Sequence, residues 1–175
     1  MPPRPATPAD IPGILAIETL PQYRAFVGRW SEARHRATLA GDDARYFVVD
    51  DDCGEGEPAE IAAYAILRGF AESSNAIELK RIAVRTPGCG TGRRFLEDLI
   101  RMVFEEFHAH RLFLDVFESN ARARHLYESL GFVYEGTLRE AALVDGEYHS
   151  LCLMSLLRGE YVREHVREYG AQKTS

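Results

Sequence analysis

Three glycines in five residues, Gly88, Gly90 and Gly92, lie between an apolar run and a long amphipathic run. Inside a regular element each glycine costs roughly 0.5–1 kcal/mol relative to alanine, so their concentration indicates that something must approach the backbone closely. A glycine-rich loop between a strand and the start of a helix presents backbone N–H groups and the positive end of the helix dipole. The stretch therefore predicts an anion site whose guest is a phosphate or a pyrophosphate.

The spacing of the glycines separates several phosphate-binding patterns. A dinucleotide-binding turn has the form G-x-G-x-x-G, whereas here Gly90 is followed by Gly92 and then by Arg93. A P-loop has G-K-[ST] at the start of its helix, and here Arg93 and Arg94 follow Gly92. Both patterns are disfavoured. What remains is R-x-x-G-x-G-x-G, which begins at Arg85, and a plain tight turn stays open as the alternative.

The elements that must position this loop follow from periodicity and turn signals. The pattern predicts helices over 7–18, 93–107 and 119–132, and a helical region over 22–41 in which a break near Gly28 is left open. It predicts strands over 44–51, 61–70, 76–84, 111–117, 132–144 and 147–157. Asp145-Gly146 between the last two strands is a strong hairpin signal. The acidic segment 50–60 reads as a solvated loop, and the tail from Arg158 as a frayed helix. This order predicts one mixed α/β sheet in a single domain.

Composition bounds the class of protein. With 175 residues, 46 % apolar and 27 % charged, the chain suits one soluble domain with a proper core. The net charge of −6 argues against a nucleic-acid groove, and no run reaches the ~18 apolar residues of a membrane span. The N-terminus lacks the apolar segment of a secretory signal, and the three cysteines form neither a disulfide framework nor a zinc spacing. We therefore expect a cytoplasmic protein with no metal, no nucleic acid and no membrane partner; a homodimer is left open.

Two motifs give the chain its resemblance to the GNAT superfamily of N-acetyltransferases. The first is the glycine loop, which fits the family's acetyl-CoA loop, (Q/R)-x-x-G-x-(G/A), from Arg85 to Gly90. The second is "NARARHLYESLGF", residues 120–132, which fits N-x-x-A-x-x-L-Y-x-x-x-G-F. One helix and one strand separate the motifs, as in the family. The resemblance covers about residues 4–157, and its end looks like the branch of ribosomal-protein N-terminal and polyamine acetyltransferases.

The resemblance implies a fold and an activity. The implied fold is one GNAT-like α/β domain over 1–175, with a core at about 4–157 and a polar tail over 158–175. A mixed six- to seven-stranded sheet, flanked by helices, would open as a V between its two central strands. The implied activity moves an acetyl group from acetyl-CoA to a primary amine by direct attack, without an acyl-enzyme, and yields coenzyme A. The acceptor would be a small-molecule amine, a protein N-terminus or a lysine. A non-catalytic acyl-CoA sensor is the alternative.

The resemblance also implies how the cofactor is held. The strand end would pair with the pantetheine through its backbone, and the amides of residues 88–93 would wrap the pyrophosphate. Arg85, Arg93 and Arg94 would add positive charge. Asn120 would hold the pantetheine arm or cap its helix, and Arg122 would reach a phosphate or face solvent. The expected cofactor-binding residues are Ile82, Ala83, Val84, Arg85, Gly88, Cys89, Gly90, Thr91, Gly92, Arg93, Asn120 and Arg122.

Amide formation requires a neutral amine, and an amine with a pKa of ~10.4 is mostly protonated at pH 7. Glu78 is the candidate base, because this position of the strand carries a glutamate in several family members. In a regular strand its side chain would point to the same face as those of Lys80 and Ile82. Tyr127 is the candidate acid, because the family places this hydroxyl near the sulfur of coenzyme A. The alternatives are a surface glutamate or an ion pair of Glu78 with Lys80, and a core tyrosine. Cys89 has no patterned His or Asp partner, so a nucleophilic thiol is disfavoured.

Overall fold

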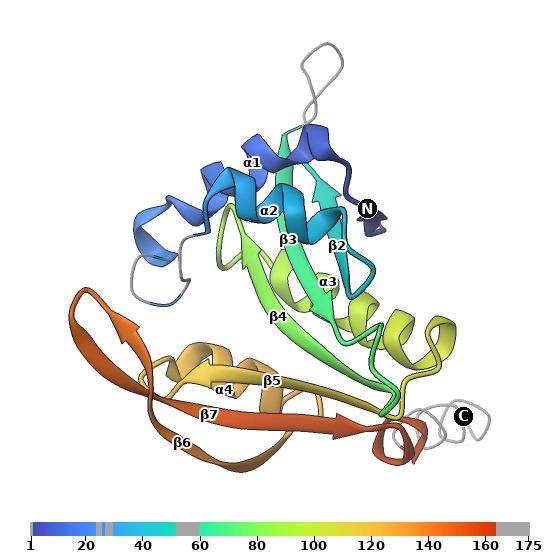
Figure 1. Ribbon diagram of the computed structural model, residues 1–175. Helices are drawn as coiled ribbons and strands as arrows, with labels where there is room; N and C mark the ends of the chain where they lie inside the picture. The colour runs from blue at the N-terminus through green and yellow to red at the C-terminus, as the bar shows by residue number, and fades with distance from the viewer. Residues whose placement is uncertain (1, 24–25, 27–29, 52–59, 164–175) are drawn as a thin grey trace.

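A seven-stranded mixed sheet with the strand order β1-β2-β3-β4-β5-β7-β6 organises the chain (Figure 1). The computed structural model describes residues 2–23, 26, 30–51 and 60–163. The strands are β1 (Arg4–Pro5), β2 (Ala44–Asp50), β3 (Ile61–Arg68), β4 (Ala76–Val84), β5 (Arg111–Phe117), β6 (Val133–Val144) and β7 (Glu147–Leu157). The mixed α/β sheet that the sequence predicts is confirmed, with β4 and β5 parallel at its centre.

Helices cover the two faces of this sheet. The longer ones are α1 (Ile11–Glu18), α2 (Glu32–Leu39), α3 (Thr91–Arg101) and α4 (Ala121–Glu128), and the short turns are η1 (Pro8–Asp10), η2 (Pro21–Tyr23) and the π-helical η3 (Met102–Glu106). α1 packs on one face with residues of β2 and β3, whereas α3 and α4 bury their apolar sides against the other face. In Figure 1, α1 and α2 accordingly lie in front of β3, and α3 lies behind it.

The observed bounds of α2 and of the C-terminal end of α3 differ from those that the sequence predicts. Within the predicted helical region 22–41, α2 covers only Glu32–Leu39, because Ser31 caps it by accepting a hydrogen bond from the Arg34 N–H at 3.2 Å. Within 22–41, residues 24–25 and 27–29 lie outside the described residues, as do 52–59 of the predicted acidic loop and 164–175 of the tail. The predicted helix 93–107 is α-helical only to Arg101 and ends in the π-helical turn.

A β-bulge at Lys80 interrupts the pairing of β4 with β3. Ile66 lies opposite Arg81, but the next residue, Leu67, lies opposite Leu79, so Lys80 is an extra residue in β4. An extra residue inverts the alternation of side chains from that point on. Leu79 accordingly faces the α3 side and Arg81 the α1 side, although both are odd-numbered.

Because of the bulge, the Glu78 side chain does not share a face with Ile82, although the sequence predicts that it does. Its neighbours Ile77 and Leu79 both belong to the core under α3, so Glu78 faces the α1 side. Ile82 packs against the core under α3, on the opposite face from Glu78. The expectation that Glu78 and Ile82 share a face is therefore wrong, because it assumed an uninterrupted two-residue period.

The two central strands open as a V. β4 pairs with β5 only over three residues, the last pair being Glu78 with Phe113. Beyond it β5 stays paired with β7 while β4 stays paired with β3, so the two halves of the sheet diverge. Figure 1 shows the wedge widening towards the connection between α1 and α2. The V-shaped opening that the resemblance implies is thus confirmed. None of the described helices is long and apolar enough to cross a bilayer.

Candidate active site

The glycine loop between β4 and α3 presents free backbone donors. Gly88 has φ +98° and Gly90 has φ +86°, and this left-handed region favours glycine. Gly90 is the residue from which α3 begins. Among the described residues, the N–H groups of Gly88, Gly90, Gly92 and Arg93 donate to no hydrogen bond outside regular elements, and the first N–H groups of a helix have no partner inside it. These amides are therefore available to donate to an anion bound at the loop.

Two guanidinium groups flank this loop. A Cβ placed on Gly88 would lie 3.9 Å from Nη2 of Arg122, and one placed on Gly90 would lie 3.7 Å from Nη2 of Arg94. Arg122 comes from the first turn of α4 and Arg94 from the first turn of α3. The loop thus combines free amides, a helix N-terminus and two cations, which is the chemistry that a pyrophosphate requires.

Arg85 and Arg93, which the sequence analysis places at the phosphate, are engaged elsewhere. Arg85 donates from Nε to the Ile61 carbonyl at 3.0 Å, and its Nη1 lies 3.3 Å from Oε2 of Glu60. Arg93 donates from Nη2 to the Ser129 hydroxyl at 2.5 Å.

For Arg93 the sequence carried a signal of this arrangement. Glu97 stands four residues later in α3, and its carboxylate lies 3.2 Å from Nη1 of Arg93. Pairs with this spacing hold each other on a helix surface. Asp98 stands four residues after Arg94 in the same way, but its carboxylate lies 3.7 Å from Nη2 of Arg101, so the spacing alone does not distinguish Arg93 from Arg94.

The other two loop residues and Asn120 have local roles. The Cys89 thiol lies 3.2 Å from the Thr91 hydroxyl and 3.1 Å from the Thr86 carbonyl, and it is exposed. The hydrogen bond from the Thr91 hydroxyl lowers the pKa of this thiol. Asn120 caps α4, because its Oδ1 accepts from the Ala123 N–H at 3.2 Å. The capping alternative for Asn120 is therefore confirmed.

A tyrosine from η2 occupies the open edge of β4. The Tyr23 hydroxyl donates to the Val84 carbonyl at 2.7 Å and lies 2.8 Å from the Val84 nitrogen, from which it accepts. Gln22 beside it donates to the Arg85 carbonyl at 3.3 Å. Burial raises the pKa of Tyr23, so its phenol stays neutral and can both donate and accept. The resemblance assigns the backbone N–H and carbonyl of Val84 to the pantetheine. In this structure both are hydrogen-bonded to Tyr23, 61 positions earlier in the chain.

Tyr127 on α4 places its ring in the core under α3 and α4. The residue is 8 % exposed, and its ring lies 5.7 Å from that of Phe132. Burial, followed by the negative charge of Asp115 and by Tyr23, raises the pKa of the Tyr127 phenol, so it carries its proton at neutral pH. No hydrogen bond of this hydroxyl is present within the described residues. Tyr127 is therefore both a core residue and a proton donor without a partner.

Three charged side chains bridge β4 and β5 on the α1 face. Nζ of Lys80 lies 3.1 Å from Oε1 of Glu78 and 3.7 Å from Oδ2 of Asp115. Glu78 also lies 4.0 Å from Nη1 of Arg68. The ion pair of Glu78 with Lys80, which the sequence analysis left open, is therefore present, and Asp115 is an acidic residue of the V that the sequence analysis did not single out.

A buried ion pair fixes the residue that follows the bulge. Arg81 donates to the Glu18 carboxylate of α1, which also accepts from the Tyr64 hydroxyl at 2.6 Å and lies 3.3 Å from Nε2 of His35. Burial by itself would raise the pKa of Glu18, but His35, Tyr64 and the Arg81 charge together bring it below its usual value. The carboxylate is thus ionised, and α1 anchors β4 beside the V.

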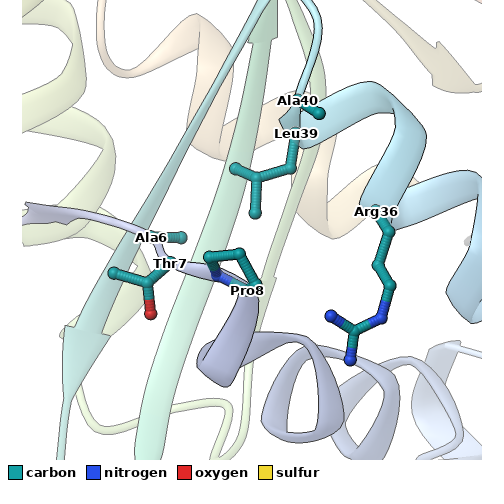
Figure 2. A pocket seen from close by; sticks show the side chains of 6 residues that line it. All are labelled: Ala6, Thr7, Pro8, Arg36, Leu39 and Ala40. Carbon is teal, nitrogen blue, oxygen red and sulfur yellow. The ribbon is translucent and has the colours of Figure 1, made fainter.

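A shallow pocket of about 330 Å³ lies elsewhere, between the N-terminal turn and α2 (Figure 2). Its lining residues are Ala6, Thr7, Pro8, Arg36, Leu39 and Ala40. This lining contains no acid and none of the residues that surround the glycine loop or the V. The chemistry described above therefore does not belong to this pocket.

Comparison with known proteins agrees with this geometry. The family described as "Acetyltransferase (GNAT) family" matches residues 15–132. A spermidine N(1)-acetyltransferase of Vibrio cholerae is 33 % identical over 81 residues, which are 46 % of this chain and 47 % of that protein. A spermine/spermidine N(1)-acetyltransferase of Bacillus subtilis is 31 % identical over 88 residues, 48 % of this chain and 58 % of that protein. The matches thus span about half the length of these relatives.

Solved structures match over nearly the whole chain. A variant of the spermidine N-acetyltransferase of Vibrio cholerae superposes with a TM-score of 0.78 at 24 % identity, covering 94 % of this chain and 99 % of that one. The same enzyme in complex with CoA and spermine has a TM-score of 0.77 at 22 % identity, covering 91 % and 96 %. At this identity the superposition shows that the fold is shared.

Proposed function

Because this chain belongs to the GNAT family of acetyltransferases, we propose that it transfers the acetyl group of acetyl-CoA to a primary amine by direct attack. The observation that carries the proposal is the set of free amides at Gly88, Gly90 and Gly92, flanked by Arg94 and Arg122. These groups fit a pyrophosphate, and the glycine loop directly follows β4, the strand that opens into the V. The family supplies the expectation that the pyrophosphate is that of coenzyme A.

The arrangement of the V supports a single displacement. Tyr127 on α4 keeps its proton at neutral pH, so its hydroxyl can supply the proton that a departing thiolate needs. The two described cysteines offer no route through an acyl-enzyme, since Cys89 is exposed in the glycine loop and Cys152 is buried in the core. The acetyl group therefore passes directly from sulfur to nitrogen.

A cationic amine of the polyamine type is the proposed acceptor class. The face of the V opposite Tyr127 carries the carboxylates of Glu78 and Asp115, which favour an ammonium group over a neutral or acidic acceptor. The chain's net charge of −6 acts in the same direction. The polyamine acetyltransferases among the relatives make spermidine the first amine to test.

The proposed function is tested by incubating the chain with acetyl-CoA and a panel of amines. The panel contains spermidine, spermine, an aminoglycoside and a peptide with a free N-terminus. Products are followed by mass, because the exposed Cys89 would react with a thiol reagent. We expect an acetylated product with spermidine or spermine. Tight CoA binding without any acetylated product across the panel would support the sensor alternative instead.

Tyr23 is expected to compete with the cofactor for the edge of β4. Tyr23→Phe keeps the ring but removes both hydrogen bonds to Val84. A neutral hydrogen bond is worth about 0.5–1.5 kcal/mol net, so we expect CoA affinity to rise by roughly three-fold to ten-fold. Calorimetry with CoA measures the change.

The matched control for this prediction is Tyr134→Phe. That tyrosine lies half-exposed on β6, and its hydroxyl bonds the Thr137 hydroxyl at 2.7 Å. Its replacement is expected to leave CoA affinity unchanged. Weaker CoA binding in Tyr23→Phe alone would show that the Tyr23 hydroxyl contacts the cofactor instead of competing with it.

A further inference from the structure

Asp115 lies inside the open part of the V. The last residue of β5 that pairs with β4 is Phe113, so Asp115 stands two residues beyond the closed end. Its backbone pairs with Leu153 of β7, on the other edge of β5. Leu114 and Val116 on either side of it are in the core under α3. The side chain of Asp115 therefore faces the α1 side, where it is 35 % exposed.

Asp115 and Tyr127 approach the V from opposite faces of the sheet. Tyr127 belongs to the core on the α3 and α4 side, and the glycine loop leads into α3. The negative charge of Asp115 nevertheless contributes to raising the pKa of the Tyr127 phenol. Tyr127 thus lies on the α3 and α4 side of the sheet, and Asp115 on the α1 side.

Lys80 shows that this face accepts an ammonium group. Its Nζ lies between the two carboxylates, closer to Glu78 (3.1 Å) than to Asp115 (3.7 Å). Glu78 also has Arg68 at 4.0 Å, so it faces two cations at the closed end of the V. Asp115 has the longer contact and the more open position. An incoming ammonium group therefore meets Asp115 with less competition than it meets Glu78.

We propose that Asp115, and not Glu78, is the general base that binds and deprotonates the acceptor amine. The inference rests on the proposed function and names the residue that receives the acceptor's proton. Asp115 takes one proton from the acceptor ammonium and passes it to solvent. The neutral nitrogen then attacks the thioester carbon, so that a C–N bond forms and the C–S bond breaks. On attack the nitrogen gives its second proton to the regenerated Asp115 carboxylate, which releases it to solvent; the sulfur takes one proton from Tyr127, and Tyr127 regains a proton from solvent.

The test compares Asp115→Asn with two other variants, using spermidine or whichever panel amine the parent acetylates. Asp115→Asn keeps size and hydrogen bonding but loses basicity, so we expect kcat/KM to fall by about 10²-fold or more at pH 7. The defect is expected to shrink as the pH rises towards the amine's pKa of ~10.4, because more of the amine is already neutral. CoA affinity by calorimetry is expected to stay unchanged, since Asp115 lies on the opposite face from the glycine loop.

The control is Asp98→Asn on α3, a carboxylate with the same 3.7 Å separation from its cation, Arg101, and a similar exposure of 36 %. It is expected to retain the parent's activity at every pH. Glu78→Gln is expected to lose less activity than Asp115→Asn and to keep the parent's pH profile.

Two results would overturn the assignment while leaving the proposed function in place. One is an Asp115→Asn variant within three-fold of the parent at all pH values. The other is a larger, pH-dependent loss in Glu78→Gln than in Asp115→Asn, which would return the base to Glu78. A parent that acetylates no amine of the panel would contradict the proposed function itself, and this inference with it.

Discussion

Replacing Tyr127 with phenylalanine will lower kcat by about ten-fold to a thousand-fold, within the range for losing a general acid. The ring stays in the core beside Phe132, and only the hydroxyl is lost. Because burial and the nearby Asp115 raise the pKa of this phenol, its proton is retained until a stronger base, the departing thiolate, takes it. Steady-state rates and CoA affinity, measured on the same preparation, separate the loss of kcat from any loss of binding.

Tyr161→Phe is the matched control for this change. Tyr161 is 6 % exposed, stacks on Phe104 at 4.9 Å and donates to Oε1 of Glu105 at 2.7 Å, away from the V. Its hydroxyl has a partner, so we expect a lower Tm with unchanged kcat. Tyr127→Phe should show the reverse, an unchanged Tm with a reduced kcat. Turnover within two-fold of the parent, with chemistry shown to be rate-limiting, would leave Tyr127 with a packing role alone.

Gly90→Val is expected to weaken CoA binding by about a hundred-fold or more. At φ +86° a β-branched side chain is strained, and it would stand beside the Arg94 guanidinium where the anion is to approach. Hydrogen bonds to charged groups are worth about 1.5–3 kcal/mol each, so the loss of two of them reaches this magnitude. Calorimetry with CoA gives the affinity, and thermal unfolding gives the cost of strain.

Gly146→Val separates strain from binding. Gly146 has φ +88° in the hairpin turn, and a Cβ there would meet nothing within 4 Å. Both valine variants therefore carry a similar backbone penalty, but only Gly90→Val blocks the loop. We expect comparable falls in Tm and a fall in CoA affinity for Gly90→Val alone. Equal CoA affinity in the parent and in Gly90→Val would end the assignment of this loop to the pyrophosphate.

The sequence by itself determined the parts of this protein that depend on neighbouring residues. The strands 76–84 and 111–117 have the bounds that alternation and β-branched content predict. The turn at Asp145 and Gly146 has the positive φ angles that an Asp-Gly hairpin requires. The glycine loop likewise adopts left-handed angles that few other residues tolerate. Each of these features depends on local backbone sterics, which follow directly from the residue types.

Only the tertiary structure decided which side chains face the V. Parity along β4 assumed an unbroken ladder, and the single extra residue at Lys80 inverted every position after it. Arg93 is held by Ser129, the C-cap of α4, and Val84 is held by Tyr23 from η2. Asp115 gains its position because β4 and β5 separate after three pairs. These arrangements depend on contacts between residues far apart in the chain, and such contacts leave no spacing in the sequence from which they could be predicted.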